Sequence, residues 1–240
     1  MELRWVPLTE NACYQRGKPM RPTGIMVHST GTPGATLDTF TRLWNTEYPG
    51  GRAVCTHAML DDEAVYQFLP WTVEGWHSGR GDEGSANQMG YIGFEICEPK
   101  DWTTNKVYFD KAYHSAVELC VYLCRKYGLT EKNILCHSEG HQKGIASNHA
   151  DVMHWFPKFG KDMDTFRADV RKELEEVTYE QWKEYMEQYR KELAAKPVSQ
   201  WAQEDFAAAK EAGVTDGSRP GDFVTREEAA AMVRRGAGKQ

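Results

Sequence analysis

The sequence lacks any long apolar run, and it lacks an apolar segment near its start. A membrane-spanning helix needs about 18 consecutive apolar residues, and no stretch of the 240 residues approaches this length. The first 21 residues hold several basic side chains, but no apolar core follows them as it would in a secretory signal peptide. We therefore expect no membrane span and no signal peptide.

An excess of basic residues is also absent. Lysine and arginine number 29 against 35 aspartates and glutamates, so the formal net charge is −6. Domains that bind nucleic acid usually carry a basic stripe, so we expect no nucleic-acid partner. Apolar residues make up 40% of the chain and aromatic residues 12%, which excludes disordered and collagen-like chains. The HExxH motif of one large class of zinc peptidases is missing as well.

Cysteine is sparse, and most of the cysteines lie inside apolar runs. Buried thiols behave as small apolar groups, and a chain without a signal peptide is made where thiols stay reduced. We therefore predict structural, reduced cysteines. They are Cys13, Cys55, Cys97, Cys120, Cys124 and Cys136.

Strand-like and helix-like patterns alternate over the first 170 residues. The predicted elements are a strand at 24–30, a helix at 36–46, a hairpin over 53–69, a strand at 91–98, a helix from Asp110 to Gly128 and a short strand at 133–136. A long loop follows the last strand. This alternation predicts an α/β fold in which helices flank a mixed central β-sheet.

The remaining chain is helical in pattern and rich in charge. We expect a catalytic domain at 1–170, a helical connector at 171–196 and a small all-α module at 197–240. Aromatic residues recur at roughly heptad spacing between Tyr179 and Leu193. Such a stripe would pack on its own domain or form a contact between two helices of a dimer.

Several residues could carry chemistry. His28 ends a strand that is expected to be buried, where it is either a satisfied core histidine or a metal ligand. Glu95 stands inside an apolar strand, and burying an ionised carboxylate is costly, so it either faces outward or serves a site as a base. The loop after residue 136 holds four histidines and Asp151. A hydrolytic zinc site takes three protein ligands, which His28 and two loop residues would supply.

Four motifs in this order resemble the type 2 N-acetylmuramoyl-L-alanine amidase family, which includes phage endolysins and peptidoglycan recognition proteins. They are IMVHST at 25–30, WHSG at 76–79, GYIGFEI at 90–96 and a late histidine-to-aspartate loop at 137–151. The resemblance covers residues 20–170. The string CHSEGHQKGIASNHADVMHWF looks especially like endolysins of phages or prophages of Gram-positive anaerobes.

The resemblance implies a Zn²⁺ hydrolase that cuts the amide between the lactyl group of N-acetylmuramic acid and L-alanine in bacterial peptidoglycan. The family's two histidine ligands fall on His28 and His137, and its third ligand falls on Asp151. The spacing between His137 and Asp151 is longer than usual in the family. Three other residues therefore remain alternatives for the third ligand: His141, His149 and His154.

The family's catalytic and groove positions can also be placed. Its water-activating glutamate falls on Glu95, and His149 stands where the family often has lysine or threonine, a position suited to stabilising an oxyanion. Trp76 and His77 are expected to line the substrate groove, and His57 falls where the family often has a tyrosine or histidine near the metal. A structural role is the alternative for His57, and core packing is the alternative for Trp76. A non-catalytic peptidoglycan-binding protein of the same fold is the alternative, but such proteins tend to lose the third ligand.

Residues 197–240 resemble one surface-layer-homology repeat, with Trp201 and Asp216-Gly217 among the matching positions. Such repeats usually occur in threes and bind secondary cell-wall polymers. A single repeat therefore suggests either a wall-binding module or one that associates with other copies in a homo-oligomer. The likeness to endolysins implies synthesis in the host bacterial cytoplasm and release to the wall through a holin.

Overall fold

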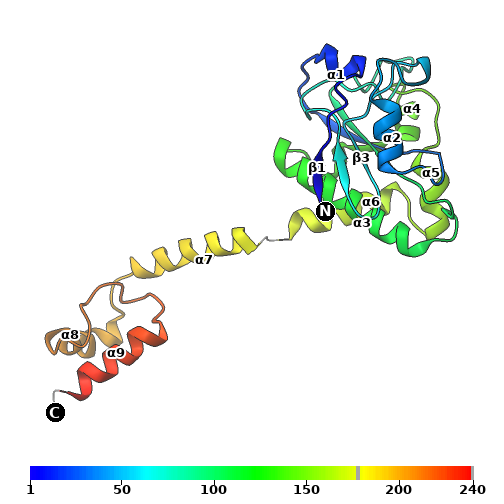
Figure 1. Cartoon of the computed structure of the whole chain (residues 1–240). Helices are drawn as coiled ribbons and strands as arrows, with labels where there is room; N and C mark the ends of the chain where they lie inside the picture. The colour runs from blue at the N-terminus through cyan, green and yellow to red at the C-terminus, as the bar shows by residue number, and fades with distance from the viewer. Residues whose placement is uncertain (177–178, 239–240) are drawn as a thin grey trace. The chain divides into compact units, whose positions relative to one another are not determined.

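The computed structural model describes residues 1–176 and 179–238 (Figure 1). They form two compact units that divide after Glu176. Residues 171–176, expected to begin the connector, therefore belong to the first unit. Residues 177, 178, 239 and 240, which fall in the expected connector and C-terminal module, lie outside the described residues.

A six-stranded sheet forms the centre of the first unit. Its strand order is β1-β4-β3-β5-β2-β6; the β3–β4 pair is antiparallel, and the other pairs are parallel. The predicted α/β fold with a mixed central sheet is thus confirmed. The strands are β1 (Leu3–Trp5), β2 (Gly24–Ser29), β3 (Ala58–Leu60), β4 (Val65–Gln67), β5 (Tyr91–Ile96) and β6 (Ile134–Cys136).

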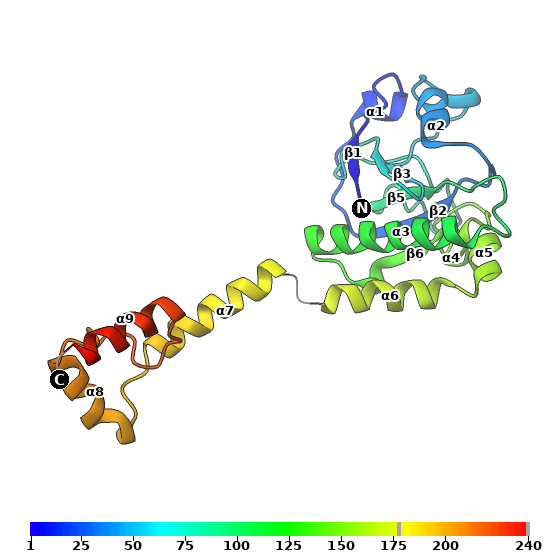
Figure 2. The same cartoon turned by 60° about the horizontal axis from the view of Figure 1, so that its bottom comes forward.

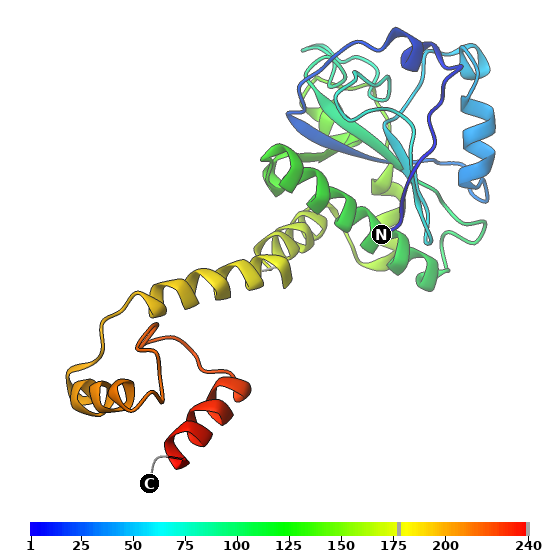
Figure 3. The same cartoon turned by 60° about the vertical axis from the view of Figure 1, so that its left-hand side comes forward.

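Helices cover both faces of this sheet. Those of the first unit are α1 (Ala12–Arg16), α2 (Leu37–Trp44), α3 (Lys106–Tyr127), α4 (His137–Gln142), α5 (Val152–Trp155) and α6 (Met163–Glu175). Three 3-10 turns accompany them: η1 (Pro49–Gly51), η2 (Glu131–Asn133) and η3 (Phe156–Phe159). Figures 2 and 3 show α3 beside α6 on one face of the sheet, with α2 on the other.

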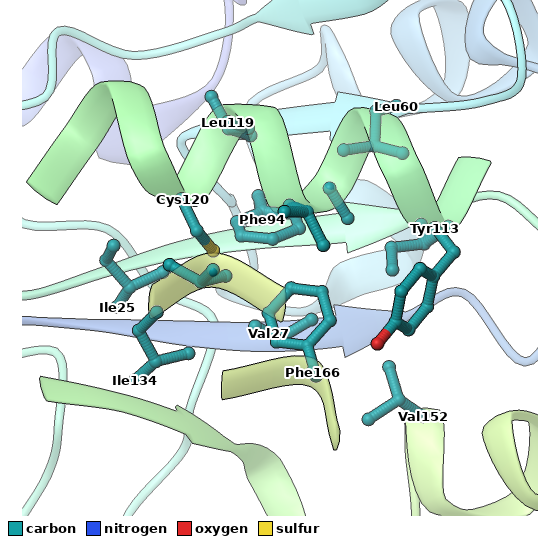
Figure 4. Close-up of a cluster of buried hydrophobic side chains, with 14 of the residues drawn as sticks. Ile25, Val27, Leu60, Phe94, Tyr113, Leu119, Cys120, Ile134, Val152 and Phe166 are labelled. Carbon is teal, nitrogen blue, oxygen red and sulfur yellow. The ribbon is translucent and has the colours of Figure 1, made fainter. Parts of the chain in front are cut away.

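The main apolar core lies between the sheet and the α3–α6 pair. Successive residues of a strand point to opposite faces of its sheet. Ile25 and Val27 of β2 and Phe94 of β5 point to one face, where they pack with Leu119 of α3 and Phe166 of α6 (Figure 4). The alternate residues of the same strands therefore point to the other face.

That other face carries a smaller apolar cluster and two candidate site residues, His28 and Glu95. Met59 of β3 packs there with Leu37 and Phe40 of α2. His28 and Glu95 alternate with the core residues of β2 and β5, so both lie on this face. The sheet thus separates the candidate site from the main core.

Helix α3 begins about one turn earlier than the sequence predicted. The prediction placed its cap at Asp110, but the Asn105 side chain accepts the capping hydrogen bond from the Tyr108 amide. Asp110 lies inside the helix, where its Oδ2 is 2.6 Å from Nζ of Lys106. The predicted end is confirmed, because Gly128 has a φ of 66°, a left-handed conformation that glycine adopts readily.

The segment after β6 is not the continuous loop that the sequence predicted. Helix α4 starts directly at His137, and the Glu139 side chain caps it by accepting a hydrogen bond from the Cys136 amide. Arg167 of α6 holds the same carboxylate through two contacts of 2.9 Å. Helix α5 is only four residues long. Helices this short leave no clear apolar period in a sequence.

The six cysteines all lie among the described residues, and all are free and buried. Their burial agrees with the prediction that the cysteines pack as small apolar groups. No described helix combines the length and the apolar character needed to cross a membrane.

The second unit is helical and has little buried surface. Its elements are α7 (Tyr179–Ala194), η4 (Gln200–Ala202), α8 (Gln203–Glu211) and α9 (Arg226–Ala237), and none of them has a buried residue. Arg190 binds Asp222 through two contacts of 3.1 Å. Thr225 and Glu228 form a capping box at the start of α9. Ser199 precedes η4, but its side chain makes no capping bond.

Candidate metal centre

Three neighbouring parallel strands bring the candidate residues together. The β2–β5 register places His28 beside Glu95. The β2–β6 register pairs Val27 with Cys136, so His137 follows at the level of His28. Side chains at one level of a parallel sheet share a face. His28 therefore stands between Glu95 and His137 at the carboxyl end of the sheet.

His28, His137 and Asp151 form a tight cluster of possible ligand atoms. Nδ1 of His28 lies 3.1 Å from Nδ1 of His137 and 3.2 Å from Oδ1 of Asp151. Oδ2 of Asp151 lies 3.2 Å from Nδ1 of His137. Among residues 1–176 and 179–238, these are the three whose ligand atoms could share one ion, all lying within 4.8 Å of one another.

The chemistry of this cluster fits a zinc ion. Two imidazole nitrogens and one carboxylate are a ligand set of catalytic zinc sites, in which a fourth position remains open. Asp151 Oδ2 is buried and has no partner with hydrogen-bond geometry. The Nδ1 atoms of His28 and His137 also lie only 3.1 Å apart, and both face the Asp151 carboxylate. A bound cation would satisfy all of these atoms at once.

Asp151 reaches the cluster from a strained backbone position. Its φ is 46° and its ψ is −129°, a combination that residues with a side chain rarely adopt. The residue directly precedes α5, in which Val152 and Trp155 are buried. Packing of that helix holds the turn in place, and strain of this kind is concentrated at functional sites.

The other loop histidines do not join the cluster. Nδ1 of His141 lies 3.3 Å from the Ala146 carbonyl oxygen. Nε2 of His154 lies 3.0 Å from Oε1 of Glu98, which is buried. His149 is exposed and lies against the ring of His137, with a centroid separation of 4.8 Å. The structure therefore brings Asp151, and not one of the three alternatives, to the two histidines.

Glu95 is a half-buried carboxylate next to this cluster. Burial raises its pKa to about 7; the negative charges of Asp151 and Glu98 add to the rise, and the charge of His28 opposes it. Oε2 of Glu95 is buried and has no hydrogen-bond partner. A carboxylate with a pKa in this range suits the exchange of a proton near neutral pH.

His57 is not placed to contact a substrate. Its side chain is fully buried, its Nε2 donates to the Val73 carbonyl oxygen at 2.7 Å, and its Nδ1 accepts from the Gly93 amide at 3.0 Å. Burial lowers its pKa to about 4, so its ring is neutral. The expectation that His57 is a site residue thus conflicts with its burial and its two backbone hydrogen bonds, which fit the structural alternative.

Trp76 and His77 differ in their surroundings. Trp76 is half-buried in the smaller apolar cluster, and the Arg16 guanidinium lies 5.9 Å from its ring centroid. His77 is buried, and its Nδ1 lies 3.0 Å from Nε2 of His28. His77 therefore lies behind the candidate ligand and not on an open groove.

Sequence reasoning missed two polar residues around the cluster. Ser147 Oγ lies 3.2 Å from Nε2 of His137, and nothing in its sequence context distinguishes it from a loop serine. Glu98 accepts from the Gly31 amide at 3.1 Å and contacts His154. The available signal for Glu98 was an acidic residue at the last position of the predicted strand at 91–98.

Comparisons with known proteins agree with this geometry. Residues 18–154 match the family model described as N-acetylmuramoyl-L-alanine amidase. The chain is 30% identical over 139 residues to N-acetylmuramoyl-L-alanine amidase CwlH of Bacillus subtilis (strain 168), covering 58% of this chain and 52% of that protein. It is 32% identical over 121 residues to amidase XlyA of the same organism, covering 50% of this chain and 38% of XlyA. The chain therefore spans about half or less of these relatives.

The fold has a counterpart among solved structures. The catalytic domain of XlyA superimposes with a TM-score of 0.55 at 23% sequence identity, covering 71% of this chain and 99% of that domain. At this identity, the likeness shows the fold alone. It agrees with the mixed sheet and flanking helices of the first unit.

Proposed function

We propose, because the chain belongs to the N-acetylmuramoyl-L-alanine amidase family, that it hydrolyses peptidoglycan at the amide between N-acetylmuramic acid and L-alanine. The observation that carries the proposal is the cluster of His28, His137 and Asp151 beside the half-buried carboxylate of Glu95. A binding protein of the same fold would need neither a complete ligand set nor a base beside it.

The candidate residues have different roles in amide hydrolysis. His28, His137 and Asp151 would hold Zn²⁺, which polarises a carbonyl and lowers the pKa of an attacking water. Glu95 accepts the proton of that water and passes it to the leaving amine of L-alanine. His149 is exposed against the ring of His137, where it would donate a hydrogen bond to the oxygen that develops negative charge.

The bond that is cut distinguishes this activity from other peptidoglycan hydrolases. Purified muropeptides incubated with the enzyme are expected to yield peptides with free L-alanine amino termini and no new reducing ends, as read by mass spectrometry. New reducing ends would identify a glycosidase and contradict the proposal. Intact muropeptides that bind to the protein with no product formed would favour the non-catalytic alternative.

The likeness to endolysins extends the proposal to the biological setting. We propose a phage or prophage endolysin that is made in the host bacterial cytoplasm and reaches the wall through a holin. The resemblance of residues 197–240 to one surface-layer-homology repeat supports a secondary cell-wall polymer as a further ligand. Several copies held together would present several repeats, and avidity would then strengthen binding without new contacts.

Helix α7 offers a surface for such association. Tyr179, Trp182, Met186 and Tyr189 follow the 3-4-3 spacing of a coiled-coil seam. Tyr179, Trp182 and Tyr189 are 67%, 51% and 48% exposed within the described chain. A second copy of α7 in the same register would cover this stripe, so we propose a homodimer.

A charge placed on this stripe is expected to separate the copies. Trp182→Glu should shift the full chain from dimer to monomer in sedimentation velocity, because a carboxylate in an apolar seam loses its hydration. Gln188→Glu adds the same charge on another side of α7 and should leave the dimer intact. A parent chain that sediments as a monomer, or equal dissociation by the two variants, would contradict the proposed contact.

A further inference from the structure

We propose that two side chains outside the candidate ligand set, His77 and Ser147, are positioning residues that fix the rings of the histidine ligands. His77 orients His28, and Ser147 orients His137. The inference rests on the proposed metal site, but it does not depend on which bond that site cleaves.

The orientation of His28 follows from a chain of hydrogen bonds. Nε2 of His77 lies 3.0 Å from the Tyr91 carbonyl oxygen, which can only accept, so this nitrogen carries the proton of the ring. Nδ1 of His77 then has a free lone pair, and it lies 3.0 Å from Nε2 of His28. His28 therefore donates from Nε2, and its Nδ1 lone pair points toward His137 and Asp151.

His137 is held in an equivalent way. Its Nε2 lies 3.2 Å from Oγ of Ser147. The Ser78 carbonyl oxygen can only accept, so the hydroxyl donates its one proton to it at 3.2 Å. Oγ therefore accepts the proton of His137 Nε2, which leaves the Nδ1 lone pair of His137 facing Asp151.

The surrounding backbone leaves room for these two side chains. A Cβ atom added to Gly93 in the middle of β5 would lie 2.3 Å from Cγ of His77. A Cβ atom added to Gly79, which has a φ of 64°, would lie 2.7 Å from Oγ of Ser147. Glycine at both positions thus lets His77 and Ser147 approach the ligands. This close approach explains why Gly93 of the GYIGFEI motif and Gly79 of the WHSG motif carry no side chain.

Contact with a substrate does not account for His77. The residue is 9% exposed, and each of its ring nitrogens already has a partner. Outer partners of this kind keep a metal-binding histidine in the correct tautomer and orientation, and their loss typically weakens metal binding about 10- to 100-fold.

The test measures zinc affinity in the full chain by competition with a chelator. His77→Leu removes both polar atoms and is expected to weaken zinc binding about 10- to 100-fold. In His77→Asn, the amide oxygen takes the place of Nδ1 and accepts from His28, so binding should return to within about threefold of the parent. Ser147→Ala should weaken binding about tenfold through His137.

His57→Leu is the matched control. His57 is also buried and its ring lies 5.8 Å from that of His77, yet it contacts neither histidine ligand. Its loss should lower the thermal stability of the metal-free chain and leave the zinc affinity unchanged. Equal weakening by His57→Leu and His77→Leu would overturn the proposal, as would an unchanged affinity in His77→Leu.

Two other outcomes, a His77→Leu variant that does not fold and a parent chain that binds no zinc, can be distinguished from failure of the positioning roles. If circular dichroism shows that His77→Leu does not fold, an unchanged zinc affinity in Ser147→Ala overturns the proposal and a tenfold loss supports it. A parent chain that binds no zinc would overturn the metal site itself. Zinc bound equally by parent and variants would leave that site standing and remove only the positioning roles.

Discussion

Replacing Glu95 with glutamine is expected to slow muropeptide cleavage by about 10²- to 10⁴-fold, the usual contribution of general acid–base catalysis. Glutamine keeps the shape of the side chain but cannot take a proton from water. Glu95 is not one of the three clustered ligand residues, so zinc content should stay near one ion per chain. The rate is read from product formation under saturating substrate, and zinc is read by elemental analysis.

Glu98→Gln is the control for this experiment. Glu98 is another carboxylate at the end of β5, but it is engaged by the Gly31 amide and His154. Its neutralisation should cause a much smaller loss than that of Glu95. A loss below about threefold in Glu95→Gln would mean that another group takes the proton. Equal losses in the two variants would point to a general effect of removing buried charge.

Loss of a ligand is expected to abolish both metal binding and activity. His28→Ala and Asp151→Ala each leave two protein ligands, too few for a stable zinc site. Both variants should purify without zinc, and neither should release L-alanine peptides above background. Chelator treatment of the parent should have the same effect on activity, and added zinc should restore it.

His149→Ala separates the two assignments in the histidine-rich segment. His149 is exposed and stands outside the clustered ligands, so this variant should keep its zinc and lose part of its rate. Should His149→Ala lose zinc while Asp151→Ala retains it, the third ligand would be His149. Full activity in the metal-depleted parent would contradict the zinc mechanism altogether.

The sequence predicted the sheet and several of its elements because their apolar periods are strong. Residues 24–30 form a short apolar run bounded by turn residues, residues 91–98 alternate, and both segments contain a strand. The start of α3 was misplaced because Asn105 and Asp110 are both good caps in sequence, and only packing selects between them. Helices α4 and α5 were missed since neither is long enough to show a period.

The candidate site could likewise be predicted only in part from the sequence. His28 and Glu95 could be singled out because each interrupts an apolar strand. The choice of Asp151 among several loop residues came from family resemblance, since spacing along a loop does not determine distance in space. The relation of His77 to His28 could not be predicted, because it depends on a ring packed over Gly93 and on a single backbone carbonyl.

The strained turn at Asp151 has a consequence for efforts to make this enzyme withstand heat. Among the described residues, Asp151 and Arg219 are the two non-glycine residues with positive φ. Backbone strain of this kind costs on the order of 1–3 kcal/mol, so a screen for thermal tolerance alone would favour glycine at both positions. At residue 219 that change removes only surface ion pairs. At residue 151 it would remove one of the three candidate metal ligands, so the most heat-tolerant chains would have an incomplete ligand set.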